Sequence, residues 1–261
     1  MTNQIQNACI VAGCFVFAAL ITASSTSART LAQIKHKGAI SLCANPDALP
    51  FSSEKADPPG FQVEIARAIA EGLGVKLEPQ WIAPRSRANL VTCDILLDSI
   101  DDPAIYEGKL LLSRPYQSTG VALAVGPKTT TINGFAGVQK GQKVGVMINS
   151  LAQVVLGKRG ISQSPYAFEQ EMLDDLAKGQ LYGVAASPAT IAYYIRQHPE
   201  SGMRLVHAYD SDSQLAWNVA VGMRNADQPL VDAINRLLER LLADGTITAI
   251  YGRYGVEHRA P

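Results

Sequence analysis

The sequence predicts an α/β protein of two units, because short apolar runs typical of buried strands alternate with helical stretches along most of the chain. The alternation runs through residues 40–98 and again through residues 143–209. Two strand-like segments, GVALAVGP at residues 120–127 and AWNVAVGM at residues 216–223, are expected to cross between the units. The first unit is therefore expected to be discontinuous, with residues 29–122 and 220–261 in lobe one and residues 123–219 in lobe two.

The first 28 residues contain no charged side chain, and residues 10–21 within them are apolar. This apolar run is too short for a membrane-spanning helix, which needs roughly 20 residues. Thr26, Ser27 and Ala28 supply the small residues that a signal peptidase requires before Arg29. We expect residues 1–28 to be a signal peptide and the mature protein to be periplasmic.

Lobe one is expected to begin with a strand at residues 40–43, which Asn45 and Pro46 end by turn chemistry. Apolar residues then recur every three to four positions over residues 61–73, which predicts an amphipathic helix that stops at Gly74. A strand at residues 75–81, a short helix at 87–92 and a buried strand at 93–98 complete a βαβαβ pattern. A mostly parallel sheet follows from this order of elements.

Removal of the signal peptide leaves Cys43 and Cys93 as the cysteines of the mature chain, in a compartment that favours oxidation. The pattern places Cys43 near the end of one strand and Cys93 at the start of another. A disulfide between them requires Cα atoms no more than about 7 Å apart. The sequence leaves open whether this condition is met.

The second unit is expected to repeat the same logic, with strands at residues 143–148, 181–186 and 204–209 and helices at residues 151–158, 169–178 and 189–197. After the return crossing, residues 230–241 show one apolar helix face. Asp227 is expected to cap this helix, Pro229 to lie in its first turn and Gly245 to end it. This tail helix is expected to pack back on lobe one.

The charge balance excludes several functions. The 23 basic and 23 acidic side chains give a formal net charge of zero, so the basic surface expected of a nucleic-acid-binding protein is missing. Small molecules or proteins are the expected partners. The four histidines lie far apart without ligand spacing, and the sequence words of nucleotide-binding, serine-hydrolase and zinc-protease sites do not occur. We expect neither an enzyme nor a resident metal or cofactor.

Three longer words, LLSRPYQSTGVALAV, EMLDDLAKGQLYGVAASPATIAYYI and LLADGTITAIYGRYG, resemble periplasmic solute-binding proteins of the polar-amino-acid type, family 3. This resemblance implies a two-lobed type II periplasmic-binding-protein fold that closes on its ligand by hinge motion. In that family an Arg in lobe one and an Asp in lobe two hold an α-amino acid. Tyr106 and Ala186 stand at the corresponding positions here. A phenol and a methyl group cannot replace these charges, so an amino-acid importer is disfavoured.

The word CANPDALPFSSE, the helix start at Gly60 and the later Cys93-Asp94 are similar to the MxaJ- and XoxJ-type proteins, which are associated with PQQ-dependent methanol dehydrogenase. That resemblance implies an accessory role in alcohol oxidation, with the dehydrogenase or a cytochrome c as partner. Residues 99–112 do not follow this pattern, so partner contacts cannot be assigned. The alternative is the substrate-binding component of an ABC importer for a small neutral or cationic solute, with a permease as partner.

Candidate ligand-binding residues are expected at strand ends and helix starts around the crevice between the lobes, where carboxyl-end loops converge. The acidic group after residue 97 suits a cation or a polyol, but a solvated acidic turn that ends at Pro103 is the favoured explanation. Asn149 and Ser150 could bind ligand, cap a helix, or do both. The complete set of candidates is Asn45, Asp47, Phe51, Trp81, Asp98, Ser99, Asp101, Tyr116, Asn149, Ser150 and Ser187.

Overall fold

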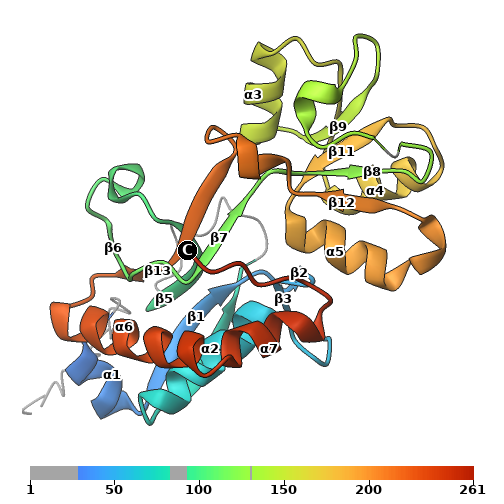
Figure 1. Cartoon of the computed structure of the whole chain (residues 1–261). Helices are drawn as coiled ribbons and strands as arrows, with labels where there is room; N and C mark the ends of the chain where they lie inside the picture. Colours follow the sequence, from blue (N-terminus) through green and yellow to red (C-terminus); the bar gives the residue numbers. More distant parts are fainter. Residues whose placement is uncertain (1–28, 83–92, 130) are drawn as a thin grey trace, which may run out of the picture.

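The computed structural model describes residues 29–82, 93–129 and 131–261, which form two α/β lobes (Figure 1). Each lobe is built on its own sheet of mixed strand direction. The two-lobed α/β architecture expected from the sequence is confirmed. The predicted signal peptide at residues 1–28 and the predicted helix at residues 87–92 lie outside the described residues.

The sheet of lobe one has the strand order β4-β1-β5-β13-β6, and β7 also pairs with β13. β1 is parallel to β4 and β5, whereas β13 runs antiparallel to β5, β6 and β7. The strands are β1 (Ala39–Ala44), β4 (Lys76–Trp81), β5 (Ile95–Ile100), β6 (Leu110–Leu112), β7 (Gln117–Gly120) and β13 (Ala216–Arg224), with a small ribbon of β2 (Asp47–Ala48) and β3 (Ser52–Ser53) after β1. The helices are α1 (Leu31–Lys37), α2 (Phe61–Gly72), the 3₁₀ helix η2 (Pro103–Tyr106), α6 (Gln228–Ala243) and α7 (Thr246–Arg253).

Helix α2 packs beside α6 and α7 under the sheet of lobe one (Figure 1). Its apolar face, with Phe61 and Ile65, is fully buried as the periodicity predicts. Gly60 precedes the helix with a φ of 103°, and a Cβ atom there would lie 2.4 Å from the carbonyl oxygen of Phe51. Only glycine fits this position. The Gly60 amide also donates to the Tyr254 hydroxyl at 2.7 Å, which ties the start of α2 to the end of α7.

Cys43 and Cys93 form a disulfide in lobe one, with their Cα atoms 5.4 Å apart. The disulfide that the sequence allowed is thus present. The strand expected at residues 93–98 begins two residues later, at Ile95. The reason is local. The Asp94 carboxylate accepts hydrogen bonds from the Ser41 amide (2.7 Å) and hydroxyl (2.7 Å), so at this residue the contact with β1 is made by a side chain, and the regular backbone pairing of β5 with β1 follows it.

The sheet of lobe two has the order β10-β9-β11-β8-β12, with β9 parallel to β10 and β11 and with β8 antiparallel to β11 and β12. Its strands are β8 (Ala122–Val125), β9 (Val144–Met147), β10 (Gln163–Tyr166), β11 (Gly183–Ala186) and β12 (Arg204–Val206). Its helices are α3 (Leu151–Lys158), α4 (Glu169–Ala177), α5 (Pro188–Gln197) and the 3₁₀ helices η3 (Phe135–Gly137), η4 (Pro199–Ser201) and η5 (Ala208–Ser211). The strand expected at residues 204–209 ends at Val206, because residues 208–211 turn into η5.

Two antiparallel segments connect the lobes. Strand β7 leads directly into β8 of lobe two, and the start of β13 pairs with β7 from Ala216 opposite Gly120 to Val219 opposite Gln117. Trp217 packs against the hydrophobic cores of both lobes. The predicted outward and return crossings are therefore present, while the boundaries at residues 122 and 219 stay a prediction.

The tail helix α6 packs into lobe one, as the sequence predicts. Its buried residues, among them Ile234 and Leu238, join the same core as β1, β5 and α2. The Asp227 carboxylate accepts a hydrogen bond from the Leu230 amide at 3.2 Å, and Pro229 lies in the first turn. The cap and the proline together explain where the helix begins.

Candidate functional site

The topology determines where a ligand crevice is expected. β1, β4 and β5 are parallel neighbours in lobe one, and β9, β10 and β11 are parallel neighbours in lobe two. The loops after these strands share the carboxyl edge of each sheet, where α/β proteins bind ligands. The candidates at or just after these strand ends are Asn45, Trp81, Asp101, Asn149 and Ser187.

The loop after β1 is held by its own side chains. The Asn45 carbonyl accepts a hydrogen bond from the Ser52 hydroxyl at 2.8 Å, and the Asn45 side chain accepts one from the Asp47 amide at 2.9 Å. The second contact is an Asx turn, which explains why a strand ends here. Both Asn45 and Asp47 remain exposed, so their side chains face solvent.

Two of the three aromatic candidates of lobe one, Phe51 and Trp81, are half-buried. Phe51 packs against Phe61 with ring centroids 5.0 Å apart, and Phe61 stacks on Tyr251 at 4.4 Å. Trp81, the last residue of β4, packs against the edge of the same core. Part of each ring therefore packs in the core, and the remaining exposed part can form an apolar wall of the crevice.

The acidic stretch lies on and after β5. Asp98 and Asp101 are exposed, whereas Ser99 between them is buried. The Asp101 amide donates to the Asn218 carbonyl at 2.9 Å, so this turn is fixed to β13. This backbone hydrogen bond fixes the turn, and the carboxylates of Asp98 and Asp101 are exposed beside it.

Tyr106, which the resemblance aligns with the family's Arg, forms a hydrogen bond with the protein backbone. Its hydroxyl accepts a hydrogen bond from the Ile100 amide at 2.6 Å. Burial raises the pKa of the Tyr106 phenol, and the nearby carboxylates of Asp98 and Asp102 raise it further. The phenol is neutral at physiological pH and provides no positive charge for a carboxylate.

Tyr116 is a correction to the predicted set. Its side chain is 0% exposed, and its hydroxyl donates to the Leu97 carbonyl inside lobe one. Burial is the main cause of a strongly raised pKa for this phenol. The aromatic ring fills the core beside Tyr251 instead of facing the crevice, so we remove Tyr116 from the candidate ligand residues.

Asn149 and Ser150 form the start of α3 in lobe two. The Ser150 hydroxyl accepts from the Gln153 amide at 3.1 Å, which makes it the N-cap. Asn149 has a φ of 60°, a left-handed conformation that Asn tolerates, and its side chain is exposed. The capping role is therefore present, and the exposed Asn149 amide stays a ligand candidate.

Glu169 is a residue that the sequence reasoning missed. It begins α4, but its carboxylate reaches the start of α5, where it accepts from the Ser187 amide at 3.1 Å and from the Thr190 hydroxyl. Ser187 itself caps α5 by accepting from the Ala189 amide at 3.2 Å. Lobe two thus carries a carboxylate beside Ala186, supplied by a neighbouring element. The position of Glu169 in a first helical turn gave no signal of this long-range contact.

The carboxyl edge of lobe two also exposes large apolar side chains. Ile148 is 49% exposed, Leu151 46% and Phe168 66%. The Ile148 amide donates to the Tyr166 carbonyl at 2.9 Å, which brings the loops after β9 and β10 together. This edge therefore presents apolar side chains together with the polar ends of α3 and α5.

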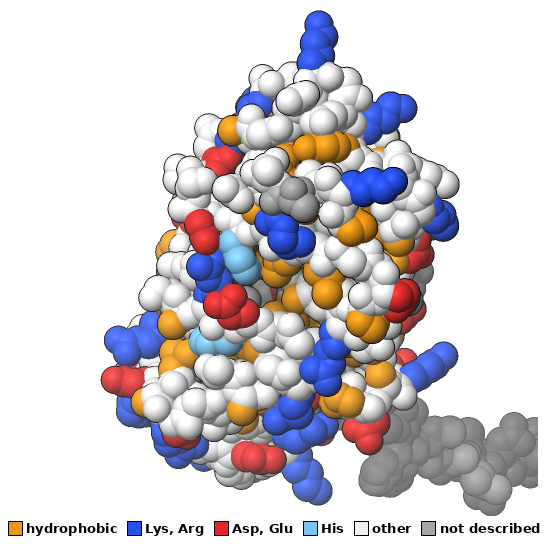
Figure 2. Space-filling view, turned by 45° about the vertical axis from the view of Figure 1, so that its right-hand side comes forward, with side chains coloured by type: hydrophobic (Ala, Val, Ile, Leu, Met, Phe, Trp, Pro, Cys, Tyr) orange, Lys and Arg blue, Asp and Glu red, His pale blue; other side chains and the backbone are white. Residues whose placement is uncertain are grey.

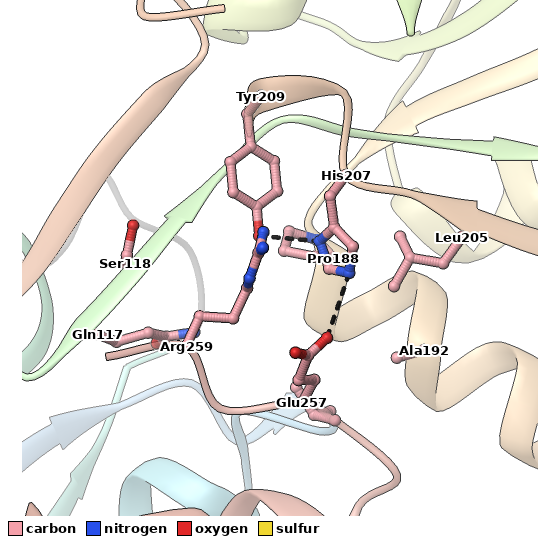
Figure 3. Close-up of a pocket in the computed structure, with 10 residues that line it drawn as sticks. Gln117, Ser118, Pro188, Ala192, Leu205, His207, Tyr209, Glu257 and Arg259 are labelled. Atoms are coloured by element: carbon pink, nitrogen blue, oxygen red, sulfur yellow. Dashed lines mark hydrogen bonds and ion pairs between the residues drawn. The ribbon is translucent and has the colours of Figure 1, made fainter. Parts of the chain in front are cut away.

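A small pocket between the lobes is lined by residues of β7, α5, β12 and η5 and by residues near the end of the chain (Figure 3). None of the predicted crevice residues lines it. The face of the molecule in Figure 2 shows histidine side chains close to acidic and basic ones.

Comparison with known proteins identifies the family. The family model for bacterial extracellular solute-binding proteins, family 3, matches residues 40–257 and so spans both lobes. The chain belongs to family 3 of the bacterial extracellular solute-binding proteins.

Individual relatives of this family 3 protein are distant. A probable histidine-binding protein of Neisseria gonorrhoeae is 25% identical over 82% of this chain and 81% of its own length. A probable amino-acid ABC transporter-binding protein of Haemophilus influenzae is 25% identical over 77% of each chain. Among solved structures, an ancestral cationic amino acid solute-binding protein superposes with a TM-score of 0.74 at 20% identity, over 86% of this chain and 99% of that one.

Family 3 domains also occur in a larger enzyme. The membrane-bound lytic murein transglycosylase F of Desulfosudis oleivorans is 27% identical over 87% of this chain, but the match covers 51% of that protein. The chain spans about half of that relative's length, and the likeness does not transfer its activity. In the described part of this family 3 chain, no helix is long and apolar enough to cross a membrane.

Proposed function

We propose that this protein is the periplasmic substrate-binding component of an ABC importer for a small neutral or cationic solute. The observation that carries the proposal is the family 3 match over residues 40–257, which includes both sheets and both crossings. Relatives named as amino-acid transporter-binding and histidine-binding proteins cover most of the same length. A membrane permease is the implied partner.

The charge of the proposed solute follows from the groups around the carboxyl edges. Lobe one offers the exposed Asp98 and Asp101, and lobe two holds the carboxylate of Glu169 at the start of α5. Carboxylates at these places repel an anion and attract a cation. A negative group at the start of α5 also occupies the helix end at which an anion would otherwise bind.

The ligands of the amino-acid-binding relatives are not transferred to this chain. A free α-amino acid needs a cation for its carboxylate, and Tyr106 at the family's Arg position is a neutral phenol. Ala186, where the family has its Asp, is buried at the end of β11 and ends in a methyl group. We expect the solute to lack the carboxylate of an amino acid, or to carry it in a masked form.

Calorimetry on residues 29–261 tests this with matched ligands. Lysine and cadaverine differ by one carboxylate, so binding of cadaverine or of a neutral polyol without binding of lysine or histidine is the expected result. A micromolar dissociation constant, about 8 kcal/mol, for any standard amino acid would refute the proposal. Glu169→Gln should weaken binding of a diamine, whereas Glu200→Gln, which removes an exposed carboxylate of lobe two, should not.

One observation favours a second function. The cysteines that belong to the resemblance with MxaJ- and XoxJ-type proteins, Cys43 and Cys93, are paired beside the NPDALPFS loop. An accessory of a quinoprotein dehydrogenase would need this surface and no solute. Genes for a permease and an ATPase next to the gene for this protein would favour the importer. Genes for a PQQ dehydrogenase and a cytochrome c at that place would favour the accessory protein. Asp98→Ala or Ser187→Ala should impair solute uptake in the first case and leave alcohol oxidation intact in the second.

A further inference from the structure

Residues 256–259, close to the end of the chain, form a tail segment. It follows α7, and Val256 at its start is buried in the core of lobe one. The carbonyl of Arg259 accepts from the Ser118 amide of β7 at 2.7 Å, and His258 donates through Nε2 to the Tyr116 carbonyl at 2.8 Å. The tail segment is therefore fixed to lobe one and to the outward crossing strand.

The other side of the tail segment binds lobe two (Figure 3). The Arg259 guanidinium donates to the Asp210 carboxylate at 2.5 Å and to the Tyr209 hydroxyl at 3.3 Å. Glu257 pairs with His207, whose Nε2 lies 3.5 Å from the carboxylate. These partners belong to η5 and to the residue just before it, so the tail segment bridges two bodies that the crossings already connect.

The Tyr209 ring lies where the outward crossing passes between the lobes. The ring is 4% exposed, and a Cβ atom at Gly120 would lie 2.5 Å from it. The guanidinium carbon of Arg259 stands 5.6 Å from the ring centroid. The ring is thus held against the crossing strand by its packing and contacted by the tail segment. A rotation of the lobes about β7 and β13 must change the distances between these groups, because they move with different bodies.

We propose that the tail segment is a latch, a connection between the lobes in addition to the two crossings and the packing of α5 on lobe one, and that it favours the arrangement described here over other hinge angles. The charged pairs through which the tail segment reaches lobe two are Arg259–Asp210 and Glu257–His207. Both pairs are partly exposed, with side-chain exposures between 24% and 66%, so each is individually weak. Together we expect them to shift the lobe equilibrium about tenfold. A ligand that requires another hinge angle would lose affinity by the same factor. The proposal concerns lobe movement alone and does not depend on the solute or on the importer.

Electron-spin distance measurements on residues 29–261 test the latch without any ligand. Spin labels at Lys109→Cys in lobe one and Lys158→Cys in lobe two use exposed side chains and report the separation of the lobes. In the double variant Asp210→Asn with Glu257→Gln, we expect a second distance whose population relative to the first rises about tenfold over the unmodified chain. Truncation after Val256, which removes both pairs together with the Arg259 contacts to Tyr209, should raise this population at least as much.

The control is Glu200→Gln, which removes an exposed pair with His198 inside lobe two and should leave the distance distribution unchanged. Cooperative thermal unfolding of each variant establishes that it folds. The double variant keeps the whole chain, so it remains informative if the truncated chain fails to fold. Distance distributions of the double variant that superpose on those of the unmodified chain would overturn the latch.

Discussion

At the scale of single residues, Asp94 joins three segments of lobe one. Its carboxylate is 1% exposed and accepts hydrogen bonds from the Ser41 amide and hydroxyl, at 2.7 Å each, and from the Arg29 side chain at 2.5 Å. The charge is buried, but it has a partner of opposite sign and several donors. When one partner of a buried ion pair is removed, the other charge stays buried without compensation, and the folded protein is strongly destabilised.

Asp94→Asn is therefore expected to destabilise lobe one by about 3 kcal/mol, because Arg29 loses its counter-ion and Ser41 loses a strong acceptor. The unfolding midpoint in urea measures this. Glu107→Gln breaks the pair with Lys109, whose side chains are 75% and 77% exposed, and should leave the midpoint unchanged. An equal midpoint for Asp94→Asn would show that the buried carboxylate contributes nothing net.

The Arg159–Asp212 pair predicts a pH dependence. Hydrogen bonding from Arg159 lowers the pKa of the Asp212 carboxyl below its usual value. A group with a lowered folded-state pKa stabilises the protein above its unfolded pKa of about 3.9, and this contribution is lost as the pH falls through the folded value. Asp212→Asn should therefore reduce stability at neutral pH by less than about 1 kcal/mol. The difference from the unmodified chain should vanish in urea titrations repeated at increasingly acid pH. A difference that persists in acid would assign the effect to packing.

At the scale of elements, the cap of α6 also holds α1. The Asp227 carboxylate accepts from the Leu230 amide at 3.2 Å and from the Leu31 amide at 3.0 Å. One side chain thus satisfies the first turns of two helices, which lie far apart in the sequence.

Asp227→Ala should cost about 1–2 kcal/mol, because both amides lose their acceptor. Asp227→Asn keeps an oxygen that can accept both hydrogen bonds, so it should lower the free energy of unfolding by only a few tenths of the loss caused by Asp227→Ala. Denaturant unfolding of both variants gives the comparison. Equal losses for the two substitutions would mean that charge, not the hydrogen-bond acceptor, is what the site requires.

Elements with local signals were predicted well. The periodic apolar faces and capping residues predicted α2, α3 and α6 to within two or three residues. Strand β10 was missed because its four residues, QSPY, contain a proline and carry no alternation. The proline is tolerated because β10 is the edge strand of its sheet.

The candidate site was less predictable, because its contacts join residues remote in sequence. The sequence places Tyr116 just before a predicted crossing, but it cannot show that the aromatic ring turns into the core. Likewise the reach of Glu169 to Ser187 depends on how α4 and α5 pack, and the tail contacts of Arg259 depend on the path of the chain after α7. Chain topology places strand ends reliably, whereas side-chain direction is decided by tertiary packing.

At the scale of the whole molecule, the two cores are separate and share few residues, among them Trp217. The Cys43–Cys93 disulfide lies entirely in lobe one and closes a loop with a sequence separation of 50 residues. Its entropic stabilisation, about 4 kcal/mol by the chain-entropy model, therefore acts on lobe one. Lobe two gains from it only as far as the two lobes unfold together.

Replacing both cysteines by Ala should consequently lower the melting temperature of lobe one and leave that of lobe two nearly unchanged, so that calorimetry resolves two transitions. Hydrogen exchange separates the lobes directly: amides of β1 and β5 should exchange faster in the variant, while those of β9 and β11 should keep their protection. A single transition that moves as a whole would mean that the crossings and the tail segment couple the lobes into one cooperative unit. In that event the double variant Asp210→Asn with Glu257→Gln, combined with the cysteine replacements, should split the transition.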